Sequence, residues 1–134
     1  MDDNIIVKPC EVKRFIEQCM NSVGLESQSA KDLAENLVAA DIRGHFSHGL
    51  NRLDLYASNV KDGIIAQQGT PILQKETGAT GYVNGNNIIG PTVGKFCMEL
   101  AIKKAQAIGI GLVVASRWLT LTYEGMNFLW HFRF

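Results

Sequence analysis

Apolar residues recur at helical spacing over the first half of the chain, and shorter strand-like runs replace them in the second. The helical pattern covers three segments: residues 9–23, about 29–44 and 50–61. Pro9 suits a first turn, where its missing N–H costs nothing, and Gly24 suits the position just after a helix. Ser29 begins the second helix, with Asp32 as a weak capping-box signal, and Gly44 ends or bends that helix.

The strand-like pattern starts with residues 71–84, which hold two short runs around a Gly-Ala-Thr-Gly turn. This arrangement predicts a hairpin or two adjacent strands. The sequence Asn-Gly-Asn-Asn at 84–87 is typical of a turn. Pro91 begins a longer helix, which Gly109 ends, and the apolar run at 110–115 predicts a buried strand. Strand, helix and strand in this order predict an α/β layer.

The composition changes abruptly at residue 117. Six of the eleven aromatic residues lie between this point and residue 134, without a period of 2 or 3.6. Such a shift indicates a novel tail or a sequence that has left its parent reading frame, and we favour the second. The fold class is therefore α/β. We expect a helical N-terminal portion at 1–63, the start of an α/β domain at 64–116 and a divergent aromatic tail at 117–134.

Composition narrows the class of protein further. The chain has 134 residues, 46% of them hydrophobic and 19% charged, which describes a globular domain. A formal net charge of zero gives no basic field for nucleic acid or anionic lipid. No secretory signal begins the sequence and no apolar run is long enough to span a membrane. Three widely spaced cysteines without a Cys-x-x-Cys pair are typical of reduced thiols, so we expect a cytoplasmic protein.

One cluster of polar residues suits chemistry on small acids. His48, preceded by Ser47, lies between two predicted helices, with Arg43 and Arg52 nearby in sequence. Helix positions four apart share a face, so His48 and Arg52 can point into one cleft. Arginine offers a planar fork for a carboxylate, and histidine transfers protons near neutral pH. Spacing alone favours a plainer interpretation, a polar helix junction in which Ser47 caps and His48 bonds locally.

Three competing motifs are weaker. His45 and His48 have a spacing that metal ligands can use, but no further ligand clearly completes a set, so we expect no metal. Residues 90–95 resemble a phosphate loop, yet only three residues separate the glycines and Phe96 replaces the magnesium-binding hydroxyl. No Gly-x-Gly-x-x-Gly follows a strand, and no nucleophile elbow surrounds Ser47.

The residues themselves add a family resemblance. Residues 39–52, Ala-Ala-Asp-Ile-Arg-Gly-His-Phe-Ser-His-Gly-Leu-Asn-Arg, resemble the Ala-Asp-Leu-Arg-Gly-x-x-Ser-His-Gly-x-x-Arg signature of the malate/L-lactate dehydrogenase family. That family includes ureidoglycolate, sulfolactate and diketogulonate oxidoreductases. Segments 85–91 and 105–114 are similar to its next two landmarks, in order. The resemblance covers about residues 8–116, the N-terminal part of such enzymes.

The resemblance implies an oxidoreductase that acts on a small 2-hydroxy or 2-oxo acid, such as malate or lactate, with NAD or NADP. It implies a sulfolactate-dehydrogenase-like fold whose cofactor domain is not a Rossmann domain, and a homodimer. His48 would be an acid/base or substrate-orienting residue, supported by Ser47. Arg52 would hold the substrate carboxylate, with Arg43 in support. Residues that bind the cofactor are not identified.

The sequence departs from the family after residue 116. The family continues with Asn-x-x-His-[Phe/Tyr]-Gly, whose histidine is a second catalytic residue, whereas residues 117–119 read Arg-Trp-Leu. Family members are also more than twice as long. We therefore expect a truncated form with little turnover alone.

Two alternatives remain open. The chain could be a non-catalytic subunit that binds or regulates a full-length homologue, or a helical binding module with an incidental His-Gly turn. The preferred acid and the choice between NAD and NADP are also open.

Overall fold

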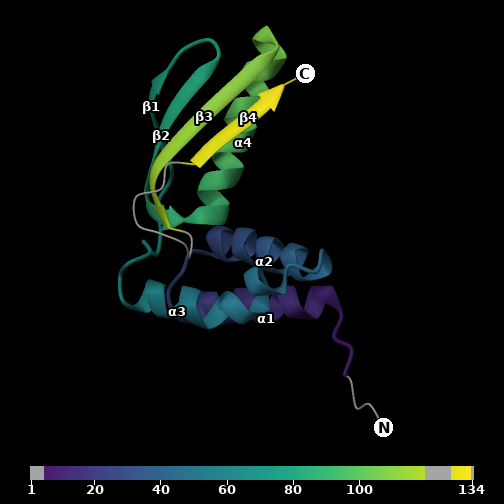
Figure 1. Cartoon of the computed structure of the whole chain (residues 1–134). Coiled ribbons are helices and arrows are strands. Elements are labelled where there is room, and N and C mark those ends of the chain that lie inside the picture. Colours follow the sequence, from purple (N-terminus) through teal and green to yellow (C-terminus); the bar gives the residue numbers. More distant parts are fainter. Residues whose placement is uncertain (1–4, 120–127, 134) are drawn as a thin grey trace.

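The computed structural model describes residues 5–119 and 128–133. The helical portion comprises α1 (Pro9–Ser22), α2 (Ser27–Ile42) and α3 (Leu53–Lys61). Between α2 and α3 lie two single-turn 3₁₀ helices, η1 (Phe46–His48) and η2 (Leu50–Arg52). The three α-helices lie together below the sheet in Figure 1.

The second portion is a four-stranded mixed sheet with one helix against it. Its elements are β1 (Ile72–Glu76), β2 (Thr80–Ile89), α4 (Gly90–Ile108), β3 (Ile110–Leu119) and β4 (Phe128–Arg133). The strand order is β1-β2-β3-β4, with β2 and β3 parallel and both outer pairs antiparallel. Because parallel neighbours need a crossover, α4 connects them and packs along one side of the sheet (Figure 1).

Alternation along the central strands explains how α4 is held. Val113 and Ala115 of β3 are buried, whereas the intervening Val114 is half-exposed. The buried set belongs to the same core as Val93 and Cys97 of α4. A strand points successive side chains to opposite faces, so only one face of the sheet is covered by α4.

One core runs through both portions. It joins buried residues of the helices, among them Ile16, Met20, Leu33 and Leu37, to those of the sheet. The helical and sheet portions therefore share a single hydrophobic interior.

A buried carboxylate reinforces the contact between α2 and α4. Asp32 of α2, with its side chain 5% exposed, accepts hydrogen bonds from Thr92 Oγ1 at 3.0 Å and Lys95 Nζ at 3.2 Å. Gln28 Nε2 donates to the same carboxylate at 3.1 Å. A buried charge is tolerated only when it is paired and hydrogen-bonded, and these three donors meet that condition.

The predicted helices and the strand-helix-strand order are confirmed, with corrections at the helix starts. The second helix begins at Ser27 rather than Ser29, and Asp32 forms no capping box because its carboxylate reaches α4 instead. The segment expected to start a helix at residue 50 begins as the separate turn η2. Gly109 ends α4 with a left-handed φ of 93°, as expected.

One prediction about the strands is wrong, and one predicted strand is longer than expected. Residues 84–87 do not end the strand: β2 continues to Ile89, with a register shift against β3 between Asn84 and Ile88. Asn86 and Asn87 take φ values of 51° and 58°, so their turn-forming tendency produces a bulge within the strand. The strand expected at 110–115 extends to Leu119.

The predicted aromatic tail contributes a strand. The sequence indicated no regular element after residue 116, yet β4 pairs antiparallel with β3 along its length. Residues 120–127 and 134 of this tail lie outside the described residues. The proposed boundaries at 63/64 and 116/117 stay predictions, although β3 crosses the second of them. Among the described residues, no helix has the length and hydrophobicity needed to cross a membrane.

Burial predicts that Cys97 resists thiol reagents. Its removal from water raises the pKa of the Cys97 thiol to about 12, so the reactive thiolate is scarce at mildly alkaline pH. We expect exposed Cys10 to be alkylated in the native protein and Cys97 only after denaturation, as followed by mass spectrometry of the labelled peptides. Equal labelling rates in the native protein would contradict this packing.

Candidate functional site

The segment between α2 and α3 holds the predicted catalytic residues in two short turns. Ser47 and His48 lie in η1, where Ser47 Oγ is 2.8 Å from His48 Nδ1. Arg52 ends η2, and its Nε donates a hydrogen bond back to the Ser47 carbonyl. These contacts fix the imidazole of His48 from one side, because a partner on Nδ1 leaves Nε2 for another group.

Asp41, in the last turn of α2, fastens this segment to the helix. Its Oδ2 accepts a hydrogen bond from the Leu50 N–H at 2.8 Å. The same carboxylate lies against the Cα of Gly49, so that a Cβ at position 49 would overlap it. Glycine is therefore required here by close approach, and the approach places His48 next to the end of α2.

A hollow of about 480 Å³ opens at this junction. It is lined by Asn36, Ala39, Ala40, Arg43, His45 and His48. Two of the four predicted site residues, Arg43 and His48, thus lie around one space, together with His45. The side chains that line it include a cationic one and no carboxylate, so the hollow suits the carboxylate of a small acid.

Arg52 is placed differently from the sequence expectation. His48 and Arg52 do not share one helix face, because Gly49 separates the two turns, and Arg52 does not line the hollow. Arg52 lies near Tyr56: burial raises the pKa of the Tyr56 phenol, and the charge of Arg52 lowers it by a smaller amount. Two of its guanidinium nitrogens remain beyond the Nε contact with Ser47.

Asn36 is the residue that sequence reasoning missed. It lies seven positions before Arg43 on α2, two helical turns away, with Ala39 and Ala40 between them. This spacing is the signature of one helix face, so periodicity measured back from Arg43 could have identified it.

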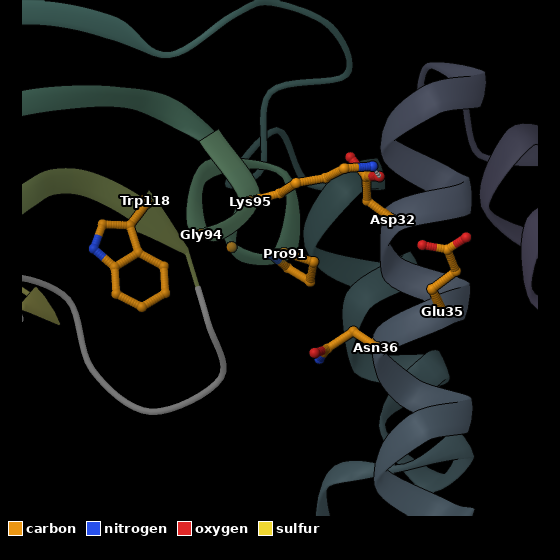
Figure 2. A pocket seen from close by; sticks show the side chains of 8 residues that line it. Asp32, Glu35, Asn36, Pro91, Gly94, Lys95 and Trp118 are labelled. Atoms are coloured by element: carbon orange, nitrogen blue, oxygen red, sulfur yellow. Dashed lines mark hydrogen bonds and ion pairs between the residues drawn. The ribbon is translucent and has the colours of Figure 1, made fainter. Parts of the chain in front are cut away.

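Asn36 also lines a second hollow, of about 470 Å³, between α2 and the start of α4. The other lining residues are Asp32, Glu35, Gly90, Pro91, Gly94, Lys95 and Trp118. Figure 2 shows Asn36 directed from α2 toward Pro91 and Trp118, while Lys95 reaches across to Asp32. The hydrogen bond to Asp32, and then its charge, raise the pKa of the Lys95 ammonium.

The first hollow combines a proton-transfer group with an anion-binding group, so it has the composition of a general acid/base site for a carboxylic acid. No group of three or more histidine, cysteine, aspartate or glutamate side chains in the described part of the chain could hold a metal ion.

Comparison with known proteins identifies the family. The malate/L-lactate dehydrogenase family matches residues 7–124, and the chain belongs to it. The chain is 36% identical over 109 residues to the malate/(S)-sulfolactate dehydrogenase of Methanothermus fervidus, covering 81% of this chain and 32% of that protein. It is 39% identical over 113 residues to the L-sulfolactate dehydrogenase of Methanocaldococcus jannaschii, covering 84% and 33%.

Solved structures agree with the sequence comparison. The malate dehydrogenase of Pyrococcus horikoshii OT3 superposes with a TM-score of 0.84 at 32% identity, covering 90% of this chain and 34% of that structure. The sulfolactate dehydrogenase of Methanocaldococcus jannaschii gives a TM-score of 0.81 at 36% identity, covering 85% and 33%. The fold is therefore that of the corresponding third of these dehydrogenases, and the chain spans about a third of their length.

The contact between Asp41 and Gly49 predicts a sharp cost for a small substitution. Gly49→Ala is expected to lower the free energy of unfolding by about 1–3 kcal/mol, because the new methyl group must displace the Asp41 carboxylate from Leu50. Urea denaturation measures the change. Gly78→Ala is the matched control, because a Cβ there would make only an ordinary 3.6 Å contact with Ile108. Equal effects of the two variants on the free energy of unfolding would contradict the close contact between Asp41 and Gly49.

Proposed function

We propose that this chain provides the acid-binding and proton-transfer part of an NAD(P)-dependent dehydrogenase for small 2-hydroxy or 2-oxo acids. The observation that carries the proposal is the joint presence of Arg43, His45 and His48 around one hollow. Membership of a family of malate and sulfolactate dehydrogenases supports the same chemistry. In the direction of reduction, such a site must hold a carboxylate and supply a proton to the neighbouring carbonyl oxygen.

His48 is proposed as the proton donor. In its protonated, imidazolium form the His48 ring donates Nδ1–H to Ser47 Oγ and carries its second proton on Nε2. This proton passes to the carbonyl oxygen as the carbonyl carbon is reduced, and returns to the ring from the alcohol in the reverse reaction. Ser47 is then a positioning residue that selects the tautomer of His48.

Arg43 is proposed as the principal carboxylate ligand, and Arg52 as a supporting one. Arg43 lines the hollow, and its Nη1 makes only a long 3.4 Å contact to the Ala39 carbonyl, so its fork remains available. Arg52 uses Nε on Ser47 and keeps only its terminal nitrogens for substrate. This assignment reverses the order of the two arginines that the family resemblance implies.

The nicotinamide cofactor would supply the hydride for the carbonyl carbon. We further propose, as the family resemblance implies, that the cofactor domain is not a Rossmann domain. The residues that discriminate between NAD and NADP would lie in the cofactor domain. We further propose a homodimer, as the family resemblance implies, and a cytoplasmic protein, as the cysteine pattern indicates.

Acid binding is the direct test of the proposal. We expect pyruvate and malate to shift the imidazole NMR signals of His45 and His48, because both rings line the hollow. Arg43→Lys should weaken this binding by about tenfold, since lysine keeps the charge but loses the planar fork. Arg52→Lys should have a smaller effect, and Arg14→Lys on α1, where the side chain pairs with Glu11, should have none.

Proton transfer is tested separately by replacing the ring. The chain alone is expected to turn over slowly, so His48→Gln should keep acid binding and lower this slow acid-dependent NAD(P)H oxidation by about 100-fold or more, the usual loss for a general acid. Oxidation is measured with pyruvate and oxaloacetate, by absorbance. The proposal would be refuted if neither acid shifted the NMR signals of His48, or if His48→Gln left the turnover unchanged.

A further inference from the structure

The two edges of the sheet differ in how well they are protected from pairing with a further strand. The strand order places β1 at one edge and β4 at the other, as Figure 1 shows. β1 carries Lys75 and Glu76, and a register shift between Leu73 and Lys75 interrupts its regular pairing with β2. Charged residues and bulges on an edge strand discourage pairing with another chain. The β1 edge is therefore protected by its sequence and its backbone.

The β4 edge lacks both kinds of protection. The sequence of β4, Phe-Leu-Trp-His-Phe-Arg at 128–133, has four apolar residues and one arginine, and its pairing with β3 has no register shift. In the described part of the chain, no strand lies on the other side of β4. A regular apolar edge strand readily pairs with a strand of another chain. Because β4 lies beyond residues 7–124, which the family matches, the family resemblance does not account for this edge.

The register of the sheet identifies which backbone groups of β4 point away from β3. Leu112 of β3 donates its N–H at 2.8 Å to the carbonyl of Ala79, next to the start of β2. Backbone groups alternate in direction along a strand, so the residues on either side of Leu112 direct theirs toward β4. The residues of β3 that do so are Gly111, Val113 and Ala115, and their partners in β4 are Phe132, Trp130 and Phe128. The outward residues of β4, whose N–H and C=O groups point to the open edge, are therefore Leu129, His131 and Arg133.

This alternation makes β4 complementary to a second copy of itself. Two antiparallel strands exchange hydrogen bonds only where outward residues lie opposite outward residues. One register brings all three outward residues of both copies together: His131 lies opposite His131 of the second copy, and Leu129 lies opposite Arg133. About six backbone hydrogen bonds then join the two strands. The two Arg133 residues lie at opposite ends of the paired segment, so their charges are kept apart.

We propose that β4 is the interface of a two-fold symmetric dimer, in which the β4 strands of two copies pair antiparallel about His131 and join the two sheets into one. A two-fold pairing closes on itself, whereas pairing of β4 with the β1 edge of another copy would continue into a filament and would meet the bulge in β1. The inference does not depend on the proposed function. The interface is also separate from the homodimer that the family resemblance implies, because the residues that match the family end at 124.

A proline at the centre of the interface is the direct test. His131→Pro removes an outward N–H and leaves the hydrogen bonds between β4 and β3 in place, because proline is tolerated where the N–H of an edge strand faces solvent. Sedimentation velocity of the full chain over a series of concentrations measures the dissociation constant of the dimer. We expect this constant to rise about tenfold or more in His131→Pro, because the hydrogen bond at the centre is lost from both copies.

Matched variants separate the backbone effect from the loss of a side chain. His131→Ala removes the same side chain as His131→Pro but keeps the N–H, so it should dimerise much as the unchanged chain does. Trp130→Pro tests the direction of the backbone groups, because it removes an N–H that is directed toward Val113. In dilute solution, where the chain is monomeric, Trp130→Pro should lower the urea midpoint well below that of Trp130→Ala. His131→Pro and His131→Ala should have similar midpoints.

The expected result is a reversible equilibrium between monomer and dimer that His131→Pro weakens and His131→Ala does not. A chain that stays monomeric at every soluble concentration would overturn the proposal. Equal dissociation constants for His131→Pro and the unchanged chain would place the dimer interface on another surface and would also overturn it. Assemblies that keep growing beyond the dimer would indicate pairing of β4 with β1, which contradicts a closed two-fold interface.

Discussion

The buried carboxylate of Asp32 is the interaction on which the arrangement of the site depends. It receives donors from Thr92 and Lys95 across the boundary between the helical portion and the sheet portion. Apolar packing holds α2 against α4 but has little directional preference, whereas these hydrogen bonds specify which residues meet. Because the first turn of α4 is held beside the middle of α2, Pro91 and Lys95 face Asn36 across one hollow.

A second carboxylate, Asp41, acts over a shorter range. It joins the end of α2 to the segment that follows by accepting the Leu50 N–H, and it leaves no room for a side chain at Gly49. The two aspartates thus control different parts of the site. Asp32 sets the distance between α2 and α4, and Asp41 sets where His48 stands relative to Arg43.

Local sequence patterns predicted most elements and only part of the site. Helical spacing predicted α1, α2 and α4 because each buries one stripe, whereas Arg43 was assigned a role through the family resemblance. The bulge in β2 was missed because asparagine and glycine favour left-handed backbone both in turns and in bulges. The proximity of Asn36 and Lys95 could not be predicted from the sequence. The packing of α2 against α4 joins residues about sixty positions apart, and helical or strand periodicity carries no information over that distance.

The two faces of helix α2 have different roles: one packs in the core and the other borders the hollows. Leu33 and Leu37 are buried in the core, while Glu35 and Asn36, between them in sequence, are exposed and border the hollows. Substitutions at the exposed positions alter what the hollows recognise with little cost in folding free energy. Ligand preference in this chain can therefore diversify, by natural drift or by design, on a backbone that remains unchanged.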